Sequence, residues 1–136
     1  MLFRSEAAAQ FEAFLKLEPN HAEAHASYAF TLAKLTPPRL QEAEAQYKKA
    51  LELNPNQMEA HNNLGNALEA EGDSSAALAS YGRAAELRPD FAEAHCNLAD
   101  ALARRKLYGD AVPAYRRAIA LRPDLVGAQL NLGNAL

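Results

Sequence analysis

The chain has 136 residues, enough for one domain of ordinary size, and its formal net charge is −3. This mild acidity argues against nucleic acid as a partner, because nucleic-acid-binding domains usually carry a strong basic patch. No apolar run approaches the roughly 20 residues that a membrane-spanning helix needs, and the first ten residues (MLFRSEAAAQ) do not resemble a signal peptide. We therefore expect a cytoplasmic protein without membrane contact, and its single cysteine, Cys96, excludes an internal disulfide.

Eight helices are predicted from apolar residues spaced three and four apart, because such residues lie on one face of a helix. Their expected ranges are 4–17, 22–35, 40–53, 58–71, 74–87, 92–105, 108–121 and 125–136. Asn20, Asn56 and Asp90 each follow a proline and precede a glutamate by three residues, a spacing typical of a capping box at a helix start. Pro113 falls inside the seventh range and is expected to kink that helix.

The same pattern recurs along the chain with a period close to 34 residues. Pro19, Pro55, Pro89 and Pro123 mark it, at intervals of 36, 34 and 34 residues. An aromatic residue stands eight positions before each proline, and a small residue stands ten positions after it. These two columns are Phe11, Tyr47, Tyr81, Tyr115 and Ala29, Gly65, Ala99, Gly133. Small residues let two helices approach closely, so that an aromatic ring of the neighbouring helix fills the gap.

The unit at 58–91 carries the motif Leu-Gly-x-x-Leu, then Ala-x-x-x-Tyr-x-x-Ala, then Pro. The matching residues are Leu64, Gly65, Leu68, Ala77, Tyr81, Ala84 and Pro89. In this motif the chain resembles the tetratricopeptide repeat family, over nearly its whole length. The resemblance implies an all-α, right-handed superhelix (solenoid) of helix pairs.

The predicted domain organisation is a single repeat array covering 1–136. Full repeats are expected at 22–57, 58–91 and 92–125, with half repeats at 1–21 and 126–136. Because solenoids normally end in a polar capping unit, these half repeats indicate a piece of a longer array. Possible head-to-tail self-association through them is a second expectation.

Two features depart from the family pattern. His25, His61, His95 and Gln129 occupy a column where the family often has tryptophan. Equivalent residues of adjacent units lie too far apart to share one metal ion, so we expect packing residues and no metal site. Phe14 replaces a small residue, so the first helix is expected to pack differently from the others.

The resemblance also implies that the first helices of the units line a concave peptide-binding groove. The side chains expected to bind a peptide there are Asn62, Asn63, Asn66, Asn97, Asp100, Arg104, Asn131 and Asn134. Within this set, Asn63, Asn97 and Asn131 form one column with Ser27. Asparagine is a poor residue in the middle of a helix, but its amide can pair with both N–H and C=O of an extended peptide.

This asparagine column has a plainer alternative, namely inheritance with the family pattern and no role in binding. The column, together with NNLGNAL at 62–68, is also similar to the repeats of O-linked N-acetylglucosamine transferases. A carboxylate clamp for acidic peptide tails is not expected, because the relevant groove positions carry no lysine. Those positions hold Ala26, Asn62, Cys96 and Leu130.

No catalytic signature is present in the sequence: there is no phosphate-binding loop, no metal-ligand spacing and no nucleophile beside a base. We therefore expect a protein–protein interaction scaffold that is not an enzyme and needs no cofactor. Two alternatives stay open: a self-assembly module, and the substrate-selecting arm of a larger glycosyltransferase-like enzyme. The basic runs at 104–106 and 116–117 are either a solvated face or a contact for an acidic partner.

Overall fold

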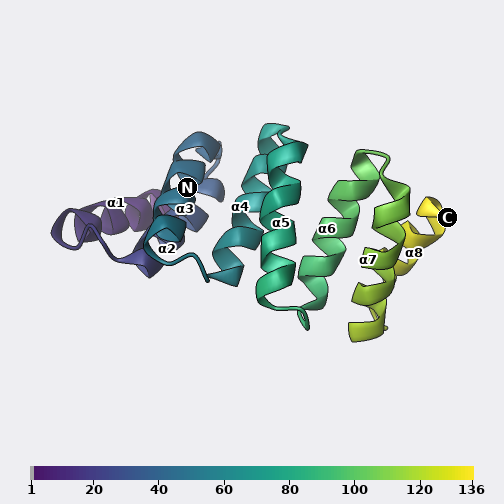
Figure 1. Ribbon diagram of the computed structural model, residues 1–136. Coiled ribbons are helices and arrows are strands. Elements are labelled where there is room, and N and C mark those ends of the chain that lie inside the picture. The colour runs from purple at the N-terminus through teal and green to yellow at the C-terminus, as the bar shows by residue number, and fades with distance from the viewer. Residues whose placement is uncertain (1) are drawn as a thin grey trace.

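The computed structural model describes residues 2–136, and the side chains of residues 6–136. This part of the chain forms eight α-helices and no strand, which confirms the all-α prediction (Figure 1). The helices are α1 (Leu2–Leu17), α2 (Ala22–Ala33), α3 (Leu40–Leu53), α4 (Met58–Glu71), α5 (Ser74–Leu87), α6 (Ala92–Arg104), α7 (Tyr108–Leu121) and α8 (Val126–Ala135). The expected ranges agree with these bounds to within two residues at each end.

Each helix packs mainly against its neighbours in the chain, so that helix pairs follow one another in a row from α2 to α8 (Figure 1). The most extensive packing is within the pairs α2–α3, α4–α5 and α6–α7. We call the first helix of each pair a first helix; these are α2, α4 and α6, and α8 takes the same place at the end of the row. The first helices make few contacts with one another. A surface with gaps between adjacent first helices is the result.

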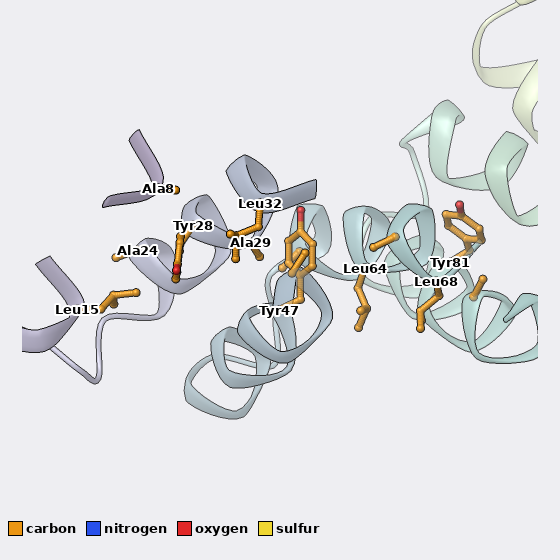
Figure 2. Close-up of a cluster of buried hydrophobic side chains, with 14 of the residues drawn as sticks. Ala8, Leu15, Ala24, Tyr28, Ala29, Leu32, Tyr47, Leu64, Leu68 and Tyr81 are labelled. Atoms are coloured by element: carbon orange, nitrogen blue, oxygen red, sulfur yellow. The ribbon is translucent and has the colours of Figure 1, made fainter. Parts of the chain in front are cut away.

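The aromatic and small columns meet in the core as predicted. Tyr47, Tyr81 and Tyr115 are buried, and Figure 2 shows the rings of Tyr47 and Tyr81 among the side chains of one core cluster. At Gly65 the fit is close, because a Cβ atom there would lie 2.6 Å from Cε1 of the Tyr81 ring. A real Cβ does not come so near to a ring carbon, so glycine is required at this helix crossing.

The first helix does pack differently. In α1 the buried side chains are Ala8 and Leu15, whereas Phe14, in the column that is small elsewhere, is 40% exposed. In Figure 1, α1 also crosses the row at a different angle from the helices of the later pairs. The Phe14 ring is too large for the crossing that alanine permits at Ala50, so α1 presents another face to α2.

The capping-box prediction is wrong. The residues at the N-caps are His21, Gln57 and Phe91, each one position later than expected, and neither Gln57 nor Phe91 makes a side-chain capping bond. The reason is a turn: Phe91 N–H donates to Arg88 O at 3.1 Å, which places Pro89 and the following aspartate in the middle of that turn. Proline favours this position, so the polar residue belongs to the turn and not to the helix start.

Two of the turns within helix pairs, those of α4–α5 and α6–α7, contain a left-handed residue. Gly72 has φ +87° after α4, and Lys106 takes the equivalent position after α6 with φ +61°. Glycine adopts this conformation freely, whereas a side chain at Lys106 makes it costly. Helix α7 continues through Pro113 without interruption; the proline lies in its second turn and removes one backbone bond there.

Candidate peptide-binding groove

A hollow of about 1030 Å³ lies between the first helices α2 and α4, and we call it the α2–α4 groove. Its lining comes from α1, α2, α4 and the turns beside them, with one residue of α3. The lining residues are Phe11, Asn20, His21, Ala22, Glu23, Ala26, Ser27, Phe30, Thr31, Tyr47, Asn54, Gln57, Met58, Glu59, Ala60, Asn63 and Arg88. Asn63, one of the predicted binding residues, and Ser27, which belongs to the same column, both line this hollow.

A second hollow of about 360 Å³, the α6–α8 hollow, lies toward the other end of the row. It contains four of the predicted binding residues: Asp100, Arg104, Asn131 and Asn134. Of the other four, Asn63 lines the α2–α4 groove, and Asn62, Asn66 and Asn97 line neither hollow. The predicted residues are thus spread over two separate places.

The asparagine column makes bonds between adjacent units. Asn97 Nδ2 donates to Asn62 Oδ1 at 3.0 Å, and Asn131 Nδ2 donates to Asp100 Oδ1 at 3.0 Å. Each bond joins one first helix to the preceding first helix, so these amides hold the units in register. Each amide still keeps a free N–H and its acceptor oxygen after this bond.

Asn63 is the exception in the column. In the unit that precedes Asn63, the position of Asn62 is occupied by Ala26 and the position of Asp100 by Phe30. Neither residue has a polar side-chain atom. Among the described residues, the Asn63 side chain accordingly has no hydrogen-bond partner, although it is half-buried in the wall of the α2–α4 groove. Its amide is available to a ligand.

The tyrosine hydroxyls likewise have partners in the later units and none in the first. Tyr81 Oη donates to Asn66 Oδ1 at 2.7 Å, and Tyr115 Oη donates to Asp100 Oδ1 at 2.5 Å. The equivalent acceptor for Tyr47 would stand at Phe30, which cannot accept. Tyr47 is only 1% exposed, and within the described part of the chain its hydroxyl has no partner, yet it lines the α2–α4 groove.

Sequence reasoning missed these tyrosine bonds, although a signal was present. Asn66 and Asp100 each stand fifteen residues before a core tyrosine, and both face it from the first helix of the same pair. A polar residue that recurs opposite a buried hydroxyl indicates a bond inside the fold. The same comparison would have identified Phe30 as the residue that leaves Tyr47 without an acceptor.

Charged and ionisable side chains of α4, α5 and α6 interact with one another. Arg104 forms an ion pair with Glu69 at 3.2 Å, so this predicted groove residue links α6 to α4. Burial, and next the nearby Glu69 carboxylate, raise the pKa of Tyr81 to about 12. Burial also raises the pKa of Cys96, with Asp100 adding to the shift, so its thiol stays protonated at neutral pH.

The histidine column has a structural role beyond packing. Its members reach back to the carbonyl oxygen of the proline six residues earlier: His25 at 2.7 Å, His61 at 2.9 Å and His95 at 2.8 Å. Gln129 donates to Pro123 O in the same way at 2.7 Å. Because a carbonyl oxygen only accepts, the Nε2 atom of each histidine carries the hydrogen. No group of three potential metal-ligating side chains (His, Cys, Asp or Glu) occurs among the described residues.

A row of antiparallel helix pairs, each touching only its neighbours, defines an α-helical repeat protein of the solenoid class. Two family models match the sequence, one described as a tetratricopeptide repeat at residues 62–126 and one as a TPR repeat at residues 39–72. The chain therefore belongs to the tetratricopeptide repeat family. No curated protein matches it. Within residues 2–136, none of the helices has the length and apolar character that a membrane crossing requires.

Solved structures show the same fold. MamA from Desulfovibrio magneticus RS-1 is 23% identical, with 97% of this chain and 73% of that one covered and a TM-score of 0.89. YrrB, a TPR protein with an unusual peptide-binding site, is 22% identical, with 97% and 67% covered and a TM-score of 0.85.

A further similar structure is the first TPR domain of Spaghetti (RPAP3) bound to an HSP90 peptide. It is 18% identical, with 84% of this chain and 89% of that one covered and a TM-score of 0.78. Neither the family models nor these structures support the expected likeness to O-linked N-acetylglucosamine transferases, which stays a prediction from the sequence.

Proposed function

We propose that this chain is a protein-interaction scaffold, not an enzyme, that binds an extended peptide in the α2–α4 groove. The observation that carries the proposal is the pair of polar groups without a partner in that groove, the Asn63 amide and the Tyr47 hydroxyl. Polar groups inside a fold are normally hydrogen-bonded, and a peptide backbone offers the donors and acceptors that both groups lack. The peptide-binding site named for YrrB and the HSP90 peptide bound to the RPAP3 domain support this class of ligand.

The other predicted binding residues have a secondary role in this proposal. Asn97, Asp100, Arg104 and Asn131 already bond within the fold, so a ligand meets only their remaining donors and acceptors. Asn134 is exposed in the α6–α8 hollow and extends the path of the peptide toward α8. Asn62 and Asn66 hold Asn97 and Tyr81 in place and act on the ligand indirectly.

Selection from a random peptide display library, followed by hydrogen-exchange footprinting of the best binder, tests the proposal. We expect added protection in α2 and α4 and little change on the outer helices α3, α5 and α7. Protection confined to those outer helices would place the ligand elsewhere and overturn the groove. Failure to select any peptide would overturn peptide binding itself.

Head-to-tail association of copies is a second candidate, favoured by the exposed apolar face of α8. Val126, Leu130 and Leu136 are 74%, 65% and 76% exposed, whereas Leu32 and Leu68, equivalent to Leu136, are buried. Sedimentation velocity over a concentration series tests it. A single monomer boundary at every concentration, unchanged in a Leu130→Ser variant, would reject association.

A further inference from the structure

We propose that the α2–α4 groove selects an extended peptide in which a lysine or arginine stands next to a large apolar residue. This inference rests on the proposed peptide-binding function and adds the chemistry of the ligand. Three observations carry it: two carboxylates without an ion pair, an aromatic hollow beside one of them, and two backbone-binding groups between the walls.

The carboxylates are Glu23 and Glu59, at equivalent positions in the first turns of α2 and α4, and both line the groove. Neither forms an ion pair with any described residue, whereas Glu93, their equivalent in α6, lies 3.6 Å from Arg122. Both carboxylates that line the α2–α4 groove thus lack an ion pair, whereas their equivalent in α6 has one. Arg88 stands at the position equivalent to Arg122 but forms no ion pair with Glu59, so a basic side chain of the ligand can pair with this carboxylate.

The cations near the groove do not neutralise these carboxylates. Arg88 lines the groove but stacks over the Phe91 ring at 5.4 Å and lies 3.9 Å from Asp90. Lys34 lies at the opposite end of α2, with its ammonium 5.3 Å from the centre of the Phe30 ring. The end of the groove that contains Glu23 is therefore acidic, and it attracts a cation and repels a carboxylate.

An apolar hollow of about 440 Å³ adjoins this acidic end, between α1 and α2. Phe11, Phe14 and Ala24 line it, and it shares Phe11, His21, Glu23 and Ser27 with the groove. Glu23 therefore stands between an aromatic hollow and the groove. One extended peptide can place an apolar side chain in the hollow and the neighbouring basic side chain against Glu23 and Glu59.

The backbone of such a peptide has two anchors in the groove. The Asn63 amide can pair with one peptide unit through an N–H and its oxygen, and the Tyr47 hydroxyl can donate to or accept from another. Both exist because Ala26 and Phe30 replace the polar residues that bond the equivalent groups elsewhere in the row. The replacement removes two internal bonds and opens one ligand site.

The test begins with the library selection on the intact chain. We expect enrichment of sequences in which Lys or Arg adjoins Leu, Ile, Met or Phe. The selected peptide, carrying a fluorescent label, is then titrated against Glu23→Gln/Glu59→Gln, where we expect at least tenfold weaker binding at low salt. Raising the salt should reduce the difference between this variant and the parent chain. The control Glu52→Gln/Glu86→Gln removes the same charge from the exposed faces of α3 and α5 and should leave binding unchanged.

A charge exchange guards against loss of folding. The variant Glu23→Lys/Glu59→Lys should not bind the selected peptide. It should bind the same peptide after its basic residue has been replaced by glutamate. Tyr47→Phe and Asn63→Ala should each weaken the parent complex about fivefold without lowering thermal stability. Two results would overturn the inference while leaving peptide binding intact. One is selection of peptides without a basic residue, and the other is binding that the Glu23/Glu59 substitutions change no more than the control substitutions do. Absence of any selected peptide would instead reject the proposed function.

Discussion

At the scale of single residues, Asn63 and Asn97 occupy one column but differ in their contacts with the preceding unit. Asn97 bonds to Asn62, and Asn63 has no such partner. Replacing either by alanine raises helix propensity by a similar amount, so the difference between the two variants isolates the bond. We expect Asn97→Ala to be about 1 kcal/mol less stable than Asn63→Ala, as measured by urea unfolding. Equal stability of the two variants would contradict a structural role for Asn97.

Gly65 gives a second prediction at this scale. In Gly65→Ala the new methyl group would meet the buried Tyr81 ring, whose hydroxyl is held by Asn66. The ring has no free direction in which to move, so we expect a loss of about 1–3 kcal/mol in the free energy of unfolding. Gly82→Ala is the matched control, because a Cβ atom there meets nothing within 4 Å and alanine favours the helix. A Gly65→Ala protein as stable as Gly82→Ala would disprove the close crossing.

At the scale of elements, each first helix from α2 to α8 is tied to its preceding turn by a side chain that donates to the proline carbonyl. His61→Ala removes one such tie, to Pro55, and should cost about 1 kcal/mol. His61→Gln should restore most of that loss, because Gln129 makes the same bond to Pro123. Thermal unfolding of the two variants beside the parent chain measures both effects. Equal losses of stability in the alanine and glutamine variants would show that the His61 ring contributes by packing and not by its bond to Pro55 O.

Lys106 gives the second prediction about elements. Its positive φ lies in the turn between α6 and α7, where the equivalent residue between α4 and α5 is Gly72. Lys106→Gly relieves a left-handed conformation that costs roughly 1 kcal/mol for a residue with a side chain. We expect the unfolding midpoint in urea to rise for Lys106→Gly and to fall for Gly72→Ala. A fall in both variants would mean that the Lys106 side chain contributes a stabilising contact.

The elements themselves could be predicted from the sequence because period and spacing are local properties. Apolar residues three and four apart, repeated after each proline, determined where the helices run. The helix starts were harder, since Pro89-Asp90 satisfies both a capping pattern and a turn pattern. The turn prevails because proline fixes its own φ and so selects the central position of the turn, which leaves Phe91 at the N-cap.

At the scale of the whole molecule, the row of buried tyrosines predicts a response to alkaline pH. Burial raises the pKa of Tyr81 to about 12, and it raises the pKa values of Tyr47 and Tyr115 as well. An unfolded tyrosine ionises near pH 10, so the stability that the fold gains from neutral phenols is constant below pH 10 and lost as the pH rises toward 12.

Thermal unfolding measured from pH 8 to pH 12 tests this response. The midpoint should fall steeply above pH 10, together with late tyrosine ionisation at 295 nm. A Tyr81→Phe variant should show a shallower fall, because one ionisable group is gone from the core. A midpoint independent of pH over this range would contradict burial of the phenols as the cause.

The candidate site was only partly predictable, for a reason that also belongs to this scale. Position within the repeat put Ser27 and Asn63 in one column, and both line the α2–α4 groove. It could not tell which amides are free, because the partner of Asn97 stands 35 residues away, in another unit. Whether an amide finds a hydrogen-bond partner depends on the adjacent unit. Each residue therefore has to be compared with the residues of the preceding unit that face it, as well as with its own column.

The bond from each first helix to its proline carbonyl spans six residues and joins the last turn of one repeat to the first helix of the next. In a duplicated copy of 58–91 inserted after residue 91, the new His61 would meet the carbonyl of the original Pro89, and the new Pro89 would meet His95. The copy would also bring its own Gly65–Tyr81 crossing. The array can therefore change its length by duplication or deletion of whole 34-residue segments. The α2 side of the α2–α4 groove, which contains Phe30, would stay the same. New docking area can be added at one end without altering the selectivity of the other.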